Sequence, residues 1–374
     1  MTRHNRAVTN PLTDERIVVR EFISDIAGSA CLEVLRSLDD QPMTTLMIAN
    51  HCKITRQTAS KHLTELTDCG LTKSTSGGAY ELTAGGKISL CAFETSFDAI
   101  DPERLTHLTR SEHTLPLLQM LSEESLRPSE LAGRSGESPS RATVRRALRL
   151  FETEGWTGEI DVDYQLTPTG ERTLDAYEEL AATIEQVMEK APWFQRLSSI
   201  RTDIPVCALR DAKLYVSSPH SPGIVVATAL ELFDRQLDRF RVLTPIFNPR
   251  LFTAYDKLLK LGLEGEAIVD ASIYKRLHDE DMEYFFDGSD YEKFEIFSLD
   301  EELTFGMGIY DEEQIAIGAY NETGQGVHIA MILSSNEAVV QWGNELYNYY
   351  RNRARHSGEQ SPRESQVKQR VPKG

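Results

Sequence analysis

The 374-residue sequence lacks the features that would direct it into a membrane or out of the cell. No apolar run approaches the roughly 18 to 20 residues of a membrane-spanning helix, and the first residues carry no apolar signal segment. The five cysteines are scattered and contain no C-x-x-C pair, so neither a zinc ribbon nor a thioredoxin-type site is expected. Reduced thiols in a cytoplasm are the expectation, with a redox switch at Cys52 or Cys69 as the minor alternative. No metal and no cofactor is expected.

Motifs of enzymes are also missing from the C-terminal half. A phospholipase-type site needs a His followed two residues later by Lys, and none of the histidines after residue 200 has that spacing. The chain has no G-x-S-x-G elbow, P-loop or H-E-x-x-H motif. Gly324 to Gly326 is interpreted as a turn, and the acidic residues of 280–283 as an exposed loop rather than a metal site. We therefore expect no enzyme, with a phospholipase-D-like enzyme as the weaker alternative.

Lysine is scarce and negative charge abundant. The chain has 12 Lys, 28 Arg and a net charge of −18, a composition that resembles proteins of salt-loving archaea. Residues 1–100 carry 10 basic and 12 acidic side chains, whereas 101–190 carry 10 and 18 and 191–356 carry 16 and 26. Net charge alone would argue against nucleic-acid binding, so only a local pattern can favour it.

An internal repeat at an offset of 85 residues supplies such a pattern. Matching positions of the two copies are Thr58 and Thr143, Leu63 and Leu148, and Gly70 and Gly155. Each copy ends in a Leu-Thr-x-x-Gly signature, at 82–86 and at 166–170. This arrangement indicates two tandem domains rather than a solenoid.

Each copy has the order of a winged helix. Apolar spacing in the first copy predicts helices over 32–38 and 46–51, then a third helix that Thr55 caps and that ends near residue 69. Gly70 is a natural stop, and 71–82 reads as a hairpin. The stretch from Ala49 to Leu71 thus resembles the winged helix–turn–helix regulators, and the resemblance covers 29–90 and 111–175. Lys53 replaces the usual turn glycine, which the second copy keeps as Gly136.

The third helix of each copy is the expected recognition helix for duplex DNA. At 100° per residue its apolar positions face the domain core and its polar positions face outward, with basic residues early and acidic ones late, as insertion into a groove requires. Gln57 can bond adenine bidentately, and threonine methyls suit thymine. The expected DNA-binding residues are Arg56, Gln57, Thr58, Ser60, Lys61, Thr64, Arg141, Thr143, Arg145, Arg146 and Arg149. A winged helix that binds protein or RNA is the alternative.

Two further helices carry apolar stripes. Leu174, Tyr177, Ala181, Ile184 and Met188 step by three and four residues, which predicts a heptad seam over 171–190. A homodimer through this seam is the expectation, and packing of the same face on its own domain is the alternative. The stripe over 88–100 is expected to pack within the chain.

After Pro192 the pattern changes to alternating strands and helices. Strands are expected at 206–209, 214–216, 240–245, 266–270, 294–299, 304–310, 314–319 and 327–333, and helices at 224–237, 249–261, 272–279 and 336–355. The stretches 242–249, 305–311, 318–320 and 342–347 resemble the C-terminal domain of archaeal regulators of the FilR family, and in outline the TrmB-like regulators, whose sensor fold is related to phospholipase D. This resemblance implies that the half binds a small effector or serves assembly.

The expected fold class is α+β, with two tandem winged helix–turn–helix domains before an α/β sensor-like domain. The expected domains are 1–100, 101–190 with the dimerisation helix, 191–356, and a disordered tail over 357–374. A pocket at the carboxyl ends of the strands would be lined by Thr244, Phe247, Asn248 and Asp311.

Overall fold

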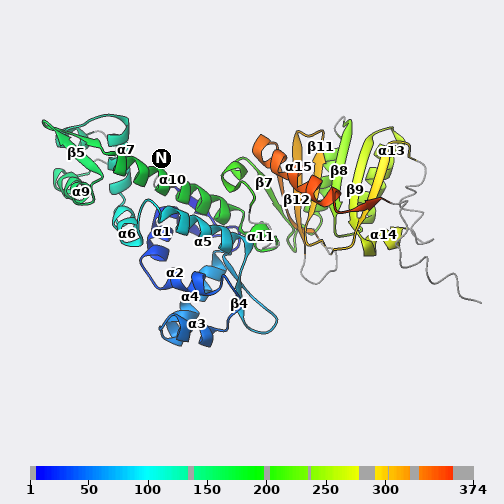
Figure 1. Ribbon diagram of the computed structural model, residues 1–374, viewed down its shortest axis with the longest axis horizontal. Coiled ribbons are helices and arrows are strands. Elements are labelled where there is room, and N and C mark those ends of the chain that lie inside the picture. The colour runs from blue at the N-terminus through cyan, green and yellow to red at the C-terminus, as the bar shows by residue number, and fades with distance from the viewer. Residues whose placement is uncertain are drawn as a thin grey trace, which may run out of the picture. The chain divides into compact units, whose positions relative to one another are not determined.

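A computed structural model of the chain describes residues 6–133, 139–197, 203–234, 237–277, 291–301, 303–320 and 328–356. The chain divides into two compact units, residues 1–195 and 196–374 (Figure 1). Four features interpreted from the sequence lie outside the described residues: Gly136, the acidic stretch 280–283, the turn 324–326 and the tail 357–374.

The first unit begins with a helix–turn–helix followed by a hairpin. Its elements are β1 (Ala7–Thr9), β2 (Arg16–Val18), α1 (Val19–Ala27), α2 (Cys31–Ser37), α3 (Thr45–His51), α4 (Arg56–Asp68), β3 (Thr72–Ser74), β4 (Tyr80–Leu82) and α5 (Ala84–Ser96). The Thr55 hydroxyl accepts a hydrogen bond from the Thr58 amide at 3.1 Å and so begins α4. Gly70 ends the helix region with a φ of 76°, which a side chain would disfavour. The β1–β2 hairpin and α1 were not predicted from the sequence.

The same succession follows in the second part of this unit. Its elements are α6 (Pro102–Thr109), α7 (Thr114–Glu123), α8 (Pro128–Leu131), α9 (Arg141–Thr153), β5 (Thr157–Ile160), β6 (Asp163–Leu166), α10 (Pro168–Glu189) and α11 (Ala191–Phe194). Ser140 caps α9 by accepting from the Thr143 amide at 3.1 Å, as Thr55 does for α4. Val144, Leu148 and Phe151 of α9 are buried, which leaves its polar side toward solvent.

The Leu-Thr-x-x-Gly signature has the same structural role in both copies. Thr167 donates its hydroxyl to the Gly155 carbonyl oxygen at 2.6 Å and accepts from the Gly170 amide at 3.1 Å. Thr83 makes the equivalent bonds, to the Gly70 carbonyl oxygen at 2.7 Å and from the Gly86 amide at 3.0 Å. Each threonine therefore caps a helix, α5 or α10, and ties it to the end of the preceding helix, α4 or α9.

The apolar seam of α10 is buried within its own chain. Leu174, Tyr177, Ile184 and Met188 are between 1% and 5% exposed. The helix packs along α5, its counterpart in the first copy, and also contacts α1 and α7. Gly85 allows this approach, since a Cβ there would lie 2.9 Å from a Val187 methyl. The prediction that this face forms a dimer seam is wrong, because the two copies of the repeat already use it to pack together.

The second unit is a mixed eight-stranded sheet with helices on both faces. Its elements are a 3₁₀ turn η2 (Val206–Leu209), β7 (Lys213–Val216), α12 (Ile224–Glu231), a 3₁₀ turn η3 (Leu232–Asp234), β8 (Arg239–Thr244), α13 (Pro249–Lys260), β9 (Glu264–Asp270), α14 (Ala271–Leu277), β10 (Phe294–Leu299), β11 (Gly306–Tyr310), β12 (Gln314–Tyr320), β13 (His328–Ser334), α15 (Glu337–Arg351) and β14 (Arg355–His356). The strand order is β14-β10-β9-β8-β11-β12-β13-β7; the neighbours β8 and β9, and β9 and β10, pair in parallel, and the other described neighbours pair antiparallel.

One expected strand of this unit is wrong. Residues 206–209 form the 3₁₀ turn η2 because Val206 and Leu209, three residues apart, are the two buried positions. The helices cover the sheet from two sides: α12 and α13 pack on one face, with Val225, Ala229 and Phe252 in its core. Helix α15 packs on the other face, against β11 and β12. Among the described helices, none is both long and apolar enough to cross a membrane.

Candidate functional site

The outward side of α4 carries the residues predicted to read bases. Arg56, Gln57, Ser60, Lys61 and Thr64 are all exposed. Lys61 lies 3.5 Å from Glu65, one turn later, and the Thr64 hydroxyl donates to the Ser60 carbonyl oxygen at 3.0 Å. The side-chain amide of Gln57 is exposed on the same face as these groups.

Two of the residues predicted to contact DNA, Thr58 and Thr143, have their hydroxyls beside the N-cap residues of their helices. The Thr58 hydroxyl lies 2.8 Å from the Thr55 hydroxyl, and the Thr143 hydroxyl lies 2.9 Å from that of Ser140. Both threonines are only partly exposed. Their position in the first turn of α4 and of α9 is explained by these contacts with the N-cap residues, without reference to a ligand.

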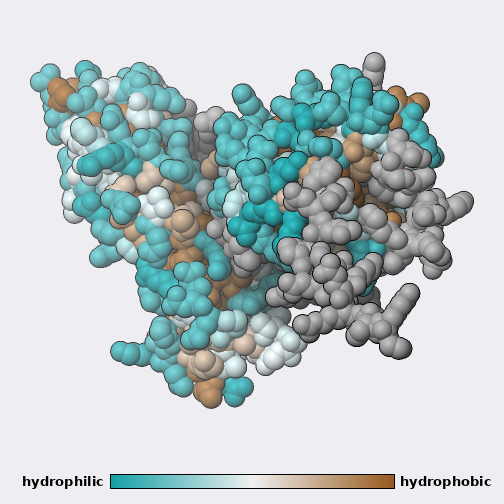
Figure 2. All heavy atoms as spheres, turned by 45° about the vertical axis from the view of Figure 1, so that its right-hand side comes forward, coloured by the Kyte–Doolittle hydropathy of each residue, from teal (hydrophilic) through white to brown (hydrophobic). Residues whose placement is uncertain are grey.

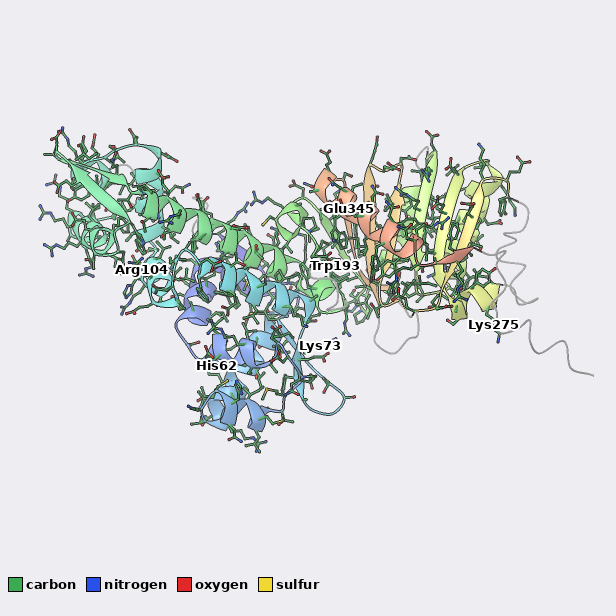
Figure 3. The ribbon with its side chains drawn as sticks, in the orientation of Figure 1. His62, Lys73, Arg104, Trp193, Lys275 and Glu345 are labelled. Carbon is green, nitrogen blue, oxygen red and sulfur yellow. The ribbon has the colours of Figure 1, made fainter. Side chains whose placement is uncertain are left out.

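Helix α9 carries a row of four exposed arginines: Arg141, Arg145, Arg146 and Arg149. Among the residues that the structure describes, none of these guanidinium groups has an acidic partner. Other arginines of this unit are paired: Arg36 with Glu94 at 2.6 Å, and Arg104 (Figure 3) with Glu154 at 2.9 Å. Hydrophilic residues cover most of the surface in view (Figure 2). In a chain with a net charge of −18, four adjacent cations without counter-charges are an unusual concentration of positive charge.

The turn before α4 holds Lys53 in a left-handed conformation, with a φ of 55°. This is the position at which the winged-helix pattern usually has glycine, so the backbone keeps the turn and accepts the strain. His51 and Lys53 also have the H-x-K spacing of phospholipases, but they end α3 and form this turn. They therefore do not build a phosphate-transfer site.

The four predicted effector residues do not lie together. Thr244 ends β8, and Asn248 caps α13 by accepting from the Arg250 and Leu251 amides. Phe247 packs on the Phe252 ring with centroids 4.5 Å apart. Asp311 follows β11, which runs antiparallel to β8, and accepts from the Asp238 and Arg239 amides at the opposite end of that strand. Including Asp311 in this pocket was wrong, because β11 is not parallel to β8.

A cavity of about 70 Å³ lies between the sheet and the helices α12 and α13. Thr244 and Asn248 line it, whereas Phe247 and Asp311 do not. Its floor consists mainly of small residues in two adjacent rows across the sheet. The rows are Ala267, Val242, Gly308 and Ala316, and Thr244, Gly306 and Gly318.

Three tyrosines that were not predicted from the sequence contribute to the cavity wall. The Tyr255 and Tyr310 hydroxyls lie 3.1 Å apart, and Tyr320 is the third. A Cβ on Gly306 would lie 1.9 Å from the Tyr320 hydroxyl, and one on Gly308 would lie 2.5 Å from that of Tyr310. Gly306 and Gly308 therefore make room for these hydroxyls. In the sequence, the signal for the cavity was a pair of glycines at positions i and i+2 of one strand, which places both on the same face of the sheet.

Desolvation keeps these phenols neutral. Burial raises the pKa of Tyr310 to about 12 and raises the pKa of Tyr255 and of Tyr320 above the ordinary value. At neutral pH the three groups are therefore hydrogen-bonding hydroxyls and not phenolates.

Desolvation favours the protonated form of three thiols in the first unit, those of Cys31, Cys52 and Cys69. Burial raises the pKa of Cys31 and of Cys69 to about 12, which disfavours the thiolate that redox chemistry needs. Burial also raises the pKa of Cys52. Within the described ranges, no cluster of His, Cys, Asp and Glu is arranged to hold a metal ion.

Three family models match successive parts of the chain. A helix-turn-helix domain matches residues 27–75, the HVO_A0261 N-terminal domain matches 102–189, and the middle domain of the methanogenesis regulatory protein FilR1 matches 224–353. A search of curated proteins found no match to the chain.

Solved structures with some likeness include TrmBL2, described as an archaeal chromatin protein with a novel mode of DNA binding. It is 18% identical, with 65% of this chain and 91% of that chain covered, at a TM-score of 0.31. The phospholipase D family member Nuc from Salmonella typhimurium is 12% identical, with 40% and 100% covered, at 0.32. NucT from Helicobacter pylori is 11% identical, with 39% and 98% covered, at 0.32. Scores this low carry no argument about function.

The family models confirm the resemblance predicted from the sequence, because a regulatory middle domain follows a helix–turn–helix domain in one chain. Residues 27–75 are thus similar to a helix-turn-helix domain, and residues 224–353 are similar to the middle domain of FilR1.

Proposed function

We propose that this chain is a transcription regulator that binds duplex DNA through two winged helices, with α4 and α9 as recognition helices. The observation that carries the proposal is the row of four exposed arginines on α9 without acidic partners among the described residues. A guanidinium group with no carboxylate nearby is available to a phosphate, and phosphate contacts supply most of the affinity of such proteins. The match of a helix-turn-helix domain to residues 27–75 supports the same role for α4.

The two recognition helices differ in chemistry and so in expected task. Helix α4 offers Gln57, Ser60 and Thr64, neutral groups that can bond base edges, with Arg56 and Lys61 beside them. Helix α9 offers mainly guanidinium groups, which contact phosphates and the acceptor edge of guanine. We expect α4 to contribute sequence preference and α9 to contribute affinity.

The affinity of the full chain for duplex genomic fragments tests the proposal, measured by fluorescence anisotropy. The α9 triple variant, with Arg145→Ala, Arg146→Ala and Arg149→Ala together, should bind all fragments at least tenfold more weakly. A charge-matched control variant removes three arginines from β2, α2 and α10, namely Arg16, Arg36 and Arg172, and should bind as the unchanged chain does. Equal affinities of the two variants, with intact circular dichroism spectra, would reject the role of α9.

The second unit is the proposed effector domain of this regulator. Its FilR1-type match and its internal cavity support a regulatory role, and a coupling of about 1–3 kcal/mol between effector and DNA would suffice. Such a regulator would act in the cytoplasm, beside the chromosome. We also propose a homodimer, through a surface other than the α10 seam, because paired sites on DNA favour twofold assemblies. Sedimentation of the full chain with and without DNA would test the dimer.

A protein-binding function for the second winged helix is the competing proposal, and one feature favours it. The tip of its hairpin exposes Ile160 by 56% and Val162 by 53%, beside the carboxylates of Glu159 and Asp161. Acidic and apolar side chains do not suit contact with phosphates, so this wing is better suited to a protein. A variant with Ile160→Ser and Val162→Ser should keep its DNA affinity if this wing does not contact DNA. A tenfold loss of affinity would show that the wing also contacts DNA.

A further inference from the structure

The cavity of the second unit has a definite chemical character. Among the described residues that line it, none carries a formal charge, and most are apolar. A charged ligand would lose its hydration there without gaining a counter-charge, so it is excluded on energetic grounds. An uncharged and largely apolar ligand loses little hydration free energy when it enters the cavity.

The tyrosine pair adds one directional requirement. The Tyr255 and Tyr310 hydroxyls share one hydrogen bond across 3.1 Å, which uses only one of their two protons. Whichever hydroxyl accepts in this bond has its own proton left to donate. Because a hydroxyl donor in an apolar cavity is stabilised by an acceptor, the cavity suits a ligand that supplies one.

The cavity is partly open to solvent, and its deep part takes only a few heavy atoms of a ligand. Its volume of about 70 Å³ is roughly half that of an engineered apolar cavity known to admit benzene. The space depends on small residues on two neighbouring strands, because Gly306 pairs with Gly318 and Gly308 pairs with Ala316. Larger residues in these two pairs would fill the space.

We propose that this cavity is a binding site for a small uncharged molecule that carries a carbonyl or ether oxygen, held by the hydroxyls of Tyr255 and Tyr310 beneath α13. The site lies on the face of the sheet, under the helices, and not in a crevice beyond the strand ends. Binding itself does not depend on DNA recognition. Only the regulatory consequence of binding rests on the proposed function.

Methyl NMR of the full chain labelled at methionine tests this proposal, with butanone as the probe and propionate as its charged isostere. Met331 and Met307 both line the cavity, but strand alternation turns the Met307 side chain to the opposite face of the sheet, where its sulfur packs beside Gly343. Butanone should shift the Met331 methyl signal saturably, with a dissociation constant in the millimolar range or below, and should leave Met307 nearly unchanged. Propionate should shift neither signal.

Two variants connect the signal to the cavity. Tyr310→Phe keeps the ring and should weaken butanone binding about 5- to 10-fold, because it removes one hydrogen bond. Ala316→Leu should abolish binding by filling the floor. Tyr347→Phe, a buried tyrosine on α15, is the matched control and should bind butanone normally. Because Tyr310→Phe adds no volume, it remains informative if Ala316→Leu fails to fold.

The outcomes separate this proposal from the regulatory function. No Met331 shift with butanone, or an equal shift with propionate, would overturn the binding site and leave the DNA-binding proposal intact. A saturable Met331 shift that Tyr310→Phe weakens would support the site whatever happens to DNA affinity. If butanone then left DNA affinity unchanged, the proposed coupling between the effector and DNA would fail instead.

Discussion

The Gly170 position offers a sharp test of how the helices and hairpin of residues 102–189 are held together. A Cβ on Gly170 would lie 2.1 Å from the Trp156 carbonyl oxygen, where a carbon–oxygen contact needs about 3.3 Å. The start of α10 would therefore have to move by about 1 Å. The obstacle is backbone and not the flexible end of a side chain, so a rotamer change cannot relieve it.

That movement would weaken two hydrogen bonds, from the Thr167 amide to the Trp156 carbonyl oxygen at 2.9 Å and from the Thr167 hydroxyl to the Gly155 carbonyl oxygen at 2.6 Å. Each contributes about 1 kcal/mol, and overpacking adds about 2 kcal/mol. The better helix propensity of alanine offsets about 1 kcal/mol. Gly170→Ala should thus lower the free energy of unfolding of the first unit by about 3 kcal/mol.

Urea denaturation followed by circular dichroism measures this change. The matched control is Gly158→Ala in β5, where the nearest atom to an added Cβ is 3.9 Å away and the change should be below about 1 kcal/mol. Equal stability of the two variants would refute the account of the Leu-Thr-x-x-Gly signature.

Three further predictions concern strain, thiols and buried phenols. Lys53→Gly should raise the free energy of unfolding by about 0.5–1 kcal/mol, because glycine accepts the φ of 55° without strain; a lower urea midpoint would contradict this. In the folded chain iodoacetamide should alkylate exposed Cys91 well before Cys31, as followed by mass spectrometry, and equal rates would show that Cys31 is accessible. The raised pKa of Tyr310, about 12 against 10 when unfolded, contributes stability that is full below pH 10 and is lost as the pH rises from 10 to 12. Urea midpoints measured across that range should fall less steeply for Tyr310→Phe, and an identical slope would count against the shift.

Several helices of the first unit, such as α4 and α9, could be predicted from the sequence because the signals for them are local. Caps such as Thr55 and glycines such as Gly70 act within one turn of chain, and the apolar side of α4 repeats every three to four residues. The partner of α10 could not be read in this way. Its apolar stripe is the same whether it packs on a second chain or on α5, and only the tertiary structure decides between them.

The candidate sites were predictable to different degrees. Exposure on α4 and α9 follows from helical periodicity, whereas the contact of the Thr58 hydroxyl with the N-cap Thr55 depends on side-chain conformation. In the second unit, Asp311 was misplaced because strand direction is not encoded in the strand itself. Tyr255 reaches the cavity from α13 and meets Tyr310 across 55 positions of sequence, a pairing that no local pattern indicates.

The central claim is that the arginines of α9 contact DNA phosphates, and the salt dependence of DNA binding tests it most directly. The slope of log Kobs against log salt concentration changes by about 0.9 for each phosphate that the protein no longer neutralises. For the α9 triple variant the slope should be flatter by about 2 to 3 than for the unchanged chain, while the charge-matched control variant keeps the original slope. Identical slopes for all three proteins would contradict the claim.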